Sequence, residues 1–377
     1  MTDPTHRVHG LAGDEIAPDW PALTAMELGD LLATIPDAGA LQALHWHSPR
    51  PLSAACLVET SRHTVFVKRH HRSVRNAATL AEEHAFLAHL RRRGLPVVEV
   101  LADRDGRTAL ARGDWTYEVH TAARGEDLYR DTMSWQPPDR LAHARTAGRM
   151  LARLHAASAG HAAAQRDTHI LVARSELATS ADPVTALQEQ LAQRPALAGY
   201  LARRDWPRDI ERLFAPWRAA QPVLARQPRL WTHGDWHVSN LCWSGGGDDA
   251  AVTCVLDFGL AAVNFALFDL ATAIERNAIA WLALEQGDRV ARIDIALALI
   301  AGYREERPLA AEELQLLADL LPVVHVDFAL SEVEYFRGIT HAMHAADVAY
   351  DTFLIGHAAW FEGGPGQRLL AAIREAA

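Results

Sequence analysis

Three polar residues in the second half of the chain have the types and spacing that phosphoryl transfer requires. Asp235 lies in the stretch 233–240, Asn240 follows it five positions later, and Asp257 comes after a Gly-rich gap. Phosphoryl transfer asks a protein mainly to aim an acceptor hydroxyl and to neutralise charge on the phosphates. We therefore predict that Asp235 is the catalytic base and that the Asn240 amide and the Asp257 carboxylate hold Mg²⁺.

The segment before Asp257 supports this interpretation. Residues 252–256 are apolar and β-branched, which predicts a buried strand with Asp257 at its tip. Asp257 is followed by Phe258 and Gly259, and such a tripeptide by itself would more often mark a turn without chemistry. Its combination with the 233–240 stretch, in this order and at this distance, favours a functional site.

Composition singles out one basic residue. Lys68 is the single lysine among the 37 basic residues, so arginine fills nearly every other position that needs positive charge. Lys68 ends the alternating segment 64–68, which predicts a short strand. A compact ammonium at that place can contact the α- and β-phosphates of a nucleotide and pair with a helix glutamate. The competing interpretation is a chance surface lysine.

The segment 77–93 is predicted to be the helix that supplies this glutamate. Its apolar residues recur at helical spacing, its last residues are basic, and Gly94 can cap it. Glu83 is our choice for the partner of Lys68, Glu82 is the alternative, and both could instead be solvated residues. Further strands are predicted at 95–101, 107–111 and 114–120, which gives about five strands and one helix before His120.

These segments together resemble the aminoglycoside phosphotransferase and choline kinase superfamily, the small-molecule branch of the kinase-like fold. The resemblance spans roughly residues 40 to 275 and rests on the following pieces of sequence: the Val-Phe-Val-Lys strand, the helix with Glu83, residues 117–119, 124–127 and 150–155, the 233–240 stretch, Asp-Phe-Gly at 257–259, and residues 268–271. It implies an α+β, two-lobed, protein-kinase-like fold. The expected division is a small β-rich lobe over 1–119 and a larger, mainly helical lobe over 120–377.

The resemblance also implies roles for single residues. ATP would lie between the lobes, with its adenine bonded to backbone around Glu118 to His120. Asp269 would brace the 233–240 stretch, and His155 is expected to be a packing residue at a helix end. The segment 47–54, where a nucleotide-covering loop belongs, has no glycine. Phosphates there would be contacted by backbone, or by Ser48, Ser53 or Arg50.

The acceptor is predicted to be a small molecule. About 75 residues separate His155 from His233, which is more than a protein kinase needs, and no Ala-Pro-Glu follows Asp257. Segments 271–284, 292–303, 310–321 and 325–349 predict helices that could shape an acceptor pocket. Polar or aromatic candidates for its wall, each of which could instead be a solvated, capping or core residue, are Trp236, His237, Glu275, Asp327 and Glu334. An amino sugar, an aminoglycoside or aminocyclitol, or an amino alcohol is the acceptor class that we rank first.

Two other functions stay open on the sequence. His233, Asp235, His237 and Asp257 could form the metal cluster of a metal-dependent phosphoesterase, although further ligands that such enzymes need are missing. A non-catalytic nucleotide-binding module of the same fold is the other alternative.

Bulk composition limits the partners. A net charge of −10 argues against nucleic acid, whose phosphates require a basic surface. Residues 1–7 do not show the basic segment and apolar core of a secretion signal, and no run of 18 apolar residues occurs, so we expect a protein that is neither secreted nor associated with a membrane. Three cysteines without paired spacing favour a cytoplasmic protein. The oligomeric state stays open.

Overall fold

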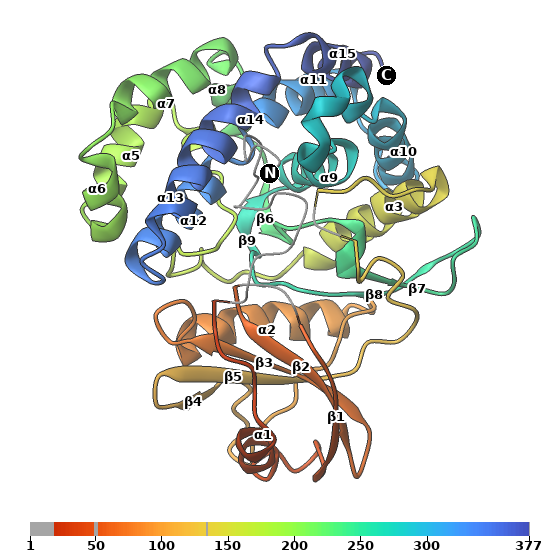
Figure 1. Cartoon of the computed structure of the whole chain (residues 1–377). Coiled ribbons are helices and arrows are strands. Elements are labelled where there is room, and N and C mark those ends of the chain that lie inside the picture. Colours follow the sequence, from red (N-terminus) through yellow and green to blue (C-terminus); the bar gives the residue numbers. More distant parts are fainter. Residues whose placement is uncertain (1–18, 49–51, 133–134, 377) are drawn as a thin grey trace.

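A five-stranded antiparallel sheet forms most of the N-terminal part of the chain (Figure 1). The computed structural model describes residues 19–48, 52–132 and 135–376. The strands are β1 (Leu41–His47), β2 (Ala54–Thr60), β3 (Thr64–His71), β4 (Leu110–Arg112) and β5 (Trp115–Thr121). They pair in the order β1-β2-β3-β5-β4, which places β3, and with it Lys68, at the centre of the sheet.

Two helices cover the two faces of this sheet. Alternation along β3 turns Val65 and Val67 to one face, where they pack against Leu28 of α1 (Ala25–Leu32). Lys68 belongs to the opposite set of β3 residues, and Figure 1 shows α2 (Ala77–Arg92) between the sheet and the rest of the molecule. The sheet with α1 and α2 is called the small lobe below.

Most of the predicted elements of the small lobe are confirmed. The predicted helix over 77–93 is α2, and five strands are present. The predicted strand over 95–101 is wrong, because Val97 and Val100 form only isolated bridges, to Val255 and His120. Pro96 has no N–H with which to continue a ladder there. Helix α1 was not predicted. The division after residue 119 stays a prediction, and β5 continues to Thr121.

The large lobe, which begins with α3, is mainly helical (Figure 1). Its helices are α3 (Leu141–Ser158), α4 (Glu176–Thr179), α5 (Pro183–Leu191), α6 (Pro195–Leu201), α7 (Trp206–Phe214), α8 (Gln221–Leu224), α9 (Ala266–Ala278), α10 (Ile293–Arg304), α11 (Ala311–Leu320), α12 (Val326–Gly338), α13 (Met343–Asp347), α14 (His357–Trp360) and α15 (Gly364–Arg374). A π-helical stretch, Val348–Gly356, links α13 to α14. Helices therefore occupy the long insertion before His233 and the segments predicted helical after Asp269. In the described part of the chain, no helix has the length and apolar character that crossing a membrane needs.

Two small ribbons of the large lobe face the small lobe. Strand β6 (Arg229–Thr232) pairs with β9 (Ala262–Phe265), and β7 (Leu241–Trp243) pairs with β8 (Val252–Val255). The loop from β6 to β7 therefore connects one ribbon to the other. The loop from β8 to β9 connects the same two ribbons. This pairing brings the 233–240 stretch beside Asp257.

Helices α3 and α10 touch backbone to backbone through two glycines. A Cβ atom on Gly148 would lie 2.0 Å from the carbonyl oxygen of Leu299, and a Cβ atom on Gly302 would lie 1.8 Å from that of Arg145. Both distances are far below van der Waals contact, so neither position accepts a side chain while the helices stay at this separation.

We predict that Gly148→Ala destabilises the protein. The added methyl group must push α3 and α10 apart, and overpacking of this kind costs about 1–3 kcal/mol of unfolding free energy. Urea unfolding followed by circular dichroism measures the change. The control is Gly29→Ala in α1, where a Cβ atom meets nothing within 4 Å and the intrinsic helix preference of alanine should give a neutral or slightly stabilising result. Equal stability of the two variants would contradict the assigned contact.

Candidate active site

The residues predicted to handle phosphate from the large lobe are brought together by the two ribbons. The side-chain amide nitrogen of Asn240 donates to the backbone oxygen of Asp235 at 2.9 Å and to its Oδ2 at 3.2 Å. The backbone N–H of Leu256 donates to the Asn240 carbonyl at 2.9 Å, which ties the two loops directly. Because the Asn240 nitrogen is committed to Asp235, its amide oxygen is the atom that a cation can bind.

His233 is a structural residue of this loop. Its Nδ1 accepts a hydrogen bond from the backbone N–H of Asp235 at 3.2 Å, and its Nε2 donates to the carbonyl of Leu256 at 2.8 Å. Both ring nitrogens are therefore occupied, and the imidazole cannot ligate a metal in this arrangement. The phosphoesterase interpretation needed that ligand, so it loses its main support.

Asp269, near the start of α9, holds the 233–240 loop by its backbone. Its two carboxylate oxygens accept the backbone N–H groups of His233 and Gly234, each at 2.8 Å. The expectation that Asp269 braces this stretch is confirmed. Burial by itself raises the pKa of Asp269, but hydrogen bonding and charge from His155, helped by His233 and the Gly234 N–H, outweigh it and hold the pKa below its usual value.

His155 does more than pack at the end of α3. Its Nε2 lies 3.1 Å from Oδ2 of Asp269, and its Nδ1 lies 2.8 Å from the hydroxyl of Tyr303 on α10. The tight crossing of α3 and α10 thus positions a hydrogen-bonded chain from Tyr303 through His155 to Asp269. The expectation of a simple packing residue was too narrow, because helix periodicity does not show which partner an inward-facing histidine meets.

Two further residues of α9 contact the loop and were missed from the sequence. Asn277 accepts the N–H of Val238 at 3.0 Å and donates to the carbonyl of Trp236 at 2.9 Å. Arg276 places its Nε 3.5 Å from Oδ1 of Asp235. Both follow Asp269 by about two helical turns and share its face of the helix, a spacing that could have identified them.

A histidine and an arginine contact the Asp235 carboxylate. His237 Nε2 lies 3.4 Å from Oδ2, and Arg276 Nε lies 3.5 Å from Oδ1. Burial alone would raise the pKa of Asp235, but the charges of His237 and Arg276 more than offset it and hold the pKa well below its usual range. The carboxylate is therefore ionised at neutral pH and can accept a hydrogen bond from a hydroxyl.

Lys68 reaches across from the small lobe to Asp257. Its Nζ lies 3.1 Å from Oδ1 of Asp257, and its side chain is only 16% exposed. Burial lowers the pKa of Lys68, but attraction to Asp257, Glu118 and Glu83 prevails and raises it, so the ammonium is charged. The pKa of Asp257 is lowered, mainly because Lys68 outweighs its desolvation. Its φ of 51° is in the left-handed region, which Asp tolerates better than most residues.

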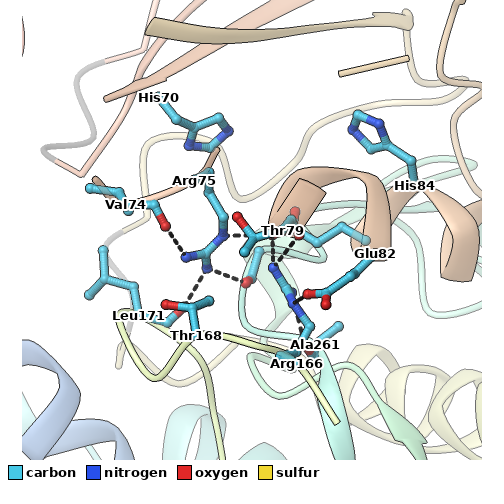
Figure 2. Close-up of polar contacts among 12 residues, drawn as sticks. His70, Val74, Arg75, Thr79, Glu82, His84, Arg166, Thr168, Leu171 and Ala261 are labelled. Atoms are coloured by element: carbon cyan, nitrogen blue, oxygen red, sulfur yellow. Dashed lines mark hydrogen bonds and ion pairs between the residues drawn. The ribbon is translucent and has the colours of Figure 1, made fainter. Parts of the chain in front are cut away.

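The predicted ion pair between Lys68 and Glu83 is wrong in this arrangement. Figure 2 shows the alternative, a network of two buried arginines on the α2 side of the small lobe. Glu83 Oε1 pairs with Arg75 Nε at 2.8 Å and with Arg166 Nη2 at 2.7 Å, and Glu82 pairs with Arg166 Nε at 3.0 Å. Both glutamates therefore pair with arginines, and no motif in the sequence predicted these pairs.

These arginines also join the lobes. Arg75, from the link between β3 and α2, donates to the carbonyls of Val74, Ile170, Leu171 and Gly259 at 2.7 to 2.9 Å. Arg166 donates to the carbonyls of Thr79 and Ala261, each at 3.0 Å (Figure 2). Their planar guanidinium groups satisfy several carbonyls at once, which a lysine could not do in the same way. Helix α2 is thereby fixed to the segments around 170 and 260 of the large lobe.

The predicted adenine contact around Glu118 to His120 needs correction. This backbone lies inside the sheet, where Glu118 and His120 pair with Lys68 and Phe66 and the Val119 carbonyl accepts the N–H of Leu101 at 2.8 Å. The Glu118 side chain is buried against histidines instead of facing solvent. The resemblance alone implied this contact, and β5 continues through these residues to Thr121. Ser53 directly precedes β2, in which Ala55 pairs with Lys68, and a phosphate contact by Ser53 stays a prediction. Arg50 lies outside the described residues.

The five acceptor-site candidates have different surroundings. Trp236 is fully buried and packs edge-on against His233 at 5.3 Å between ring centroids, so it is a core residue, contrary to the prediction. His237 contacts Asp235. Glu275 is buried beside Arg276 and His357, at 3.4 and 3.3 Å. His237 therefore adjoins the predicted base, whereas Glu275 reaches it only through Arg276, and contact with an acceptor stays a prediction for both.

Asp327 and Glu334 of α12 have internal partners. The Asp327 carboxylate accepts the N–H of Leu177 in the first turn of α4 at 3.1 Å, and burial, with repulsion from Glu176, raises its pKa to about 8. Glu334 pairs with buried Arg194 at 2.7 Å. These contacts give both residues a role in packing α12 against the inserted helices.

A two-lobed fold with a lysine reaching from the sheet to an Asp-Asn-Asp site defines a kinase-like phosphotransferase. The model of the phosphotransferase enzyme family matches residues 50–309, and the chain belongs to this family. No curated protein matches the chain significantly.

Solved structures share the fold at low identity. An aminoglycoside phosphotransferase from Alicyclobacillus acidocaldarius is 15% identical with a TM-score of 0.52, over 94% of this chain and 96% of that one. A microcompartment-associated aminopropanol kinase is 20% identical with a TM-score of 0.53, over 93% and 99%. A spectinomycin phosphotransferase, in complex with ADP and spectinomycin, is 10% identical with a TM-score of 0.54, over 95% and 100%.

We predict that Asp269→Asn destabilises the protein and lowers its activity. All three groups that face the carboxylate are donors, so the new amide NH₂ must face one of them, at a cost of about 2–4 kcal/mol of unfolding free energy. Because the folded pKa of Asp269 is depressed, its contribution is present at neutral pH and is lost as the pH falls through that folded value. The difference in unfolding free energy between wild type and variant, measured by urea unfolding, should therefore become smaller at acidic pH.

The control for this variant is Asp294→Asn. Asp294 forms a partly exposed ion pair with Arg292 at 2.9 Å, and such pairs contribute about 0–1 kcal/mol. If Asp269→Asn lowered the unfolding free energy no more than Asp294→Asn does, the Asp269 carboxylate would not be what holds the loop.

Proposed function

We propose that the protein transfers the γ-phosphoryl group of ATP to a hydroxyl of a small molecule, with Asp235 as the catalytic base. The observation that supports this most is the setting of Asp235. It is an ionised carboxylate on a braced loop, bonded to Asn240, with Asp257 and Lys68 at the neighbouring loop. The family supplies the reaction type, phosphoryl transfer.

Each residue has a role that its contacts favour. Asp235 would orient the acceptor hydroxyl and take its proton as the phosphoryl group is transferred, and its low pKa keeps the carboxylate ionised at neutral pH so that it can accept the hydroxyl's hydrogen bond. Lys68 would bind the α- and β-phosphates. The Asn240 oxygen and the Asp257 carboxylate are hard oxygen donors of the kind that Mg²⁺ prefers, and they would hold it. When bound, Mg²⁺ neutralises charge on the phosphates.

An amino sugar, aminoglycoside, aminocyclitol or amino alcohol is the acceptor class we propose. The net charge of −10 is compatible with a cationic acceptor, and the aminopropanol and spectinomycin enzymes of the same fold act in this chemical range. His237 lies beside Asp235, and Glu275 lies beside Arg276, which contacts the same carboxylate; these are the residues on which we would place the acceptor. The proposal for the acceptor is independent of the assignment of the base.

A metal-dependent phosphoesterase is not favoured by these contacts. In the part of the chain that the structure describes, the His, Cys, Asp and Glu donor atoms close enough to hold a metal ion belong to His84, Glu118 and His120, and this group contains none of the four residues that the alternative requires. A non-catalytic module is disfavoured because the base, the lysine and both cation ligands are present.

We expect Asp235→Asn to lower kcat by roughly 10²–10⁴-fold while the Kd for ATP stays close to the wild-type value, because an amide cannot take the hydroxyl proton. Lys68→Ala should mainly raise the Kd for ATP. Steady-state ADP release and nucleotide titration separate the two effects. Asp248→Asn, the same change at an exposed ion pair with Arg140, is the control and should be active. Full activity of the Asp235 variant would refute the assignment of the base.

Hydroxyl-bearing amines should stimulate ADP release above the background set by water. The test incubates the protein with ATP, Mg²⁺ and a panel of amino alcohols, aminoglycosides, aminocyclitols and neutral sugars, and measures ADP. Stimulation only by neutral sugars would overturn the acceptor class and leave the kinase proposal in place. Hydrolysis of a phosphate ester without ATP would instead favour the phosphoesterase.

A further inference from the structure

A second cluster of polar side chains lies in the small lobe, between α2 and the sheet. Glu118 of β5 is 3% exposed, and its carboxylate lies within hydrogen-bond distance of Nε2 of three histidines. The Nε2 atoms of His84 and His120 lie 2.8 Å from Oε2, and that of His70 lies 3.0 Å from Oε1. We call these four residues the histidine cluster.

The histidine cluster joins α2 to the sheet. His84 comes from α2, His70 from β3, and His120 and Glu118 from β5. His70 and His84 are both drawn in Figure 2, on the small-lobe side of the arginine network. Side chains distant in the sequence thus converge on one buried carboxylate, a convergence that the kinase reaction does not use.

Three members of the cluster have the arrangement of metal ligands. One donor atom each from His84, Glu118 and His120 lies within 4.8 Å of the other two. Imidazole and carboxylate bind Zn²⁺ at about 2.0–2.2 Å, which puts tetrahedral donors about 3.3 Å apart. The donors at 2.8 Å therefore need to separate by only about 0.5 Å to admit an ion.

The surroundings of His84 also suit a ligand. Its Nδ1 lies 2.8 Å from the hydroxyl of Thr108, a contact that fixes the ring and aims Nε2 at Glu118. A groove of about 660 Å³ runs between α2 and the segment around Val100, and both His84 and Thr108 line it. This groove gives an ion a path from the surface as far as His84, one of the three proposed ligands.

We propose that His84, Glu118 and His120 bind a divalent transition-metal ion of the Zn²⁺ type, at a site separate from Asn240 and Asp257. The ion fixes α2 to β5 on the sheet side, while Arg75 and Arg166 fix the same helix to the large lobe. His70 keeps its hydrogen bond to the other oxygen of Glu118. Imidazole ligands favour Zn²⁺ over Mg²⁺, so the two sites differ in the ions they select.

The test is calorimetric titration of Zn²⁺ into the full chain, without nucleotide or Mg²⁺, together with thermal unfolding in Zn²⁺. His84→Gln and His120→Gln each keep an N–H donor for Glu118 but lose the imidazole ligand. The matched control is His89→Gln, on the same helix, where Nε2 meets the carbonyl of Ala157. Asp257→Asn removes a ligand of the proposed magnesium site, so any Zn²⁺ bound at that site would bind more weakly in this variant.

We expect one Zn²⁺ to bind to the wild type, the His89 variant and the Asp257 variant, and to raise their unfolding temperature. Affinity should fall at least 100-fold in the His84 and His120 variants, and the rise in temperature should disappear. If either of these two folds poorly, the other gives the result, since His120 is partly exposed. Equal affinity in the wild type and the cluster variants, or no binding by the wild type, would show that the cluster is a hydrogen-bond network alone.

Discussion

The arrangement of the site depends on one buried carboxylate. Asp269 accepts two consecutive backbone N–H groups, those of His233 and Gly234, and so fixes the start of the loop that carries Asp235 and Asn240. A fully buried carboxylate is tolerated only when donors satisfy it, and here His155 supplies the third. Because His155 is oriented by Tyr303 across the glycine contact of α3 and α10, the packing of two helices that are far apart in the sequence helps to determine where the proposed base lies.

A second constraint fixes the lobes to each other. The arginine network uses Glu82 and Glu83 of α2 to bury two guanidinium groups that also satisfy carbonyls of the large lobe. This leaves Lys68 to pair with Asp257 across the lobes. The Lys68 ammonium is the group predicted to bind phosphate, and the Asp257 carboxylate is a group predicted to bind Mg²⁺. In this arrangement the two neutralise each other directly. A nucleotide bound with its cation would replace this single contact by one to phosphate and one to metal.

Much of the fold could be predicted, because its elements depend on local pattern. The alternation at 64–68, the helical spacing at 77–93 and the apolar run before Asp257 correspond to β3, α2 and β8. The predicted role of Asp269 is confirmed as well. Failures occurred where partners come from elsewhere in the chain. Glu83 was assigned to Lys68 because nothing near it in the sequence reveals Arg166, and the resemblance assigned adenine to backbone around Glu118 because no local pattern shows that these groups are paired within the sheet.

By itself, the sequence determined the reaction class and most of the elements, and it nominated Lys68, Asp235, Asn240 and Asp257 for the site, because those inferences depend on residue type and short spacing. Only the tertiary structure decided which charges meet. It paired Glu83 with Arg75 and Arg166, placed Arg276 and His237 against Asp235, buried Trp236, and gathered three histidines around Glu118. The physical reason is that the energy of a buried polar group is set by partners within a few ångströms, and those partners are brought together by packing.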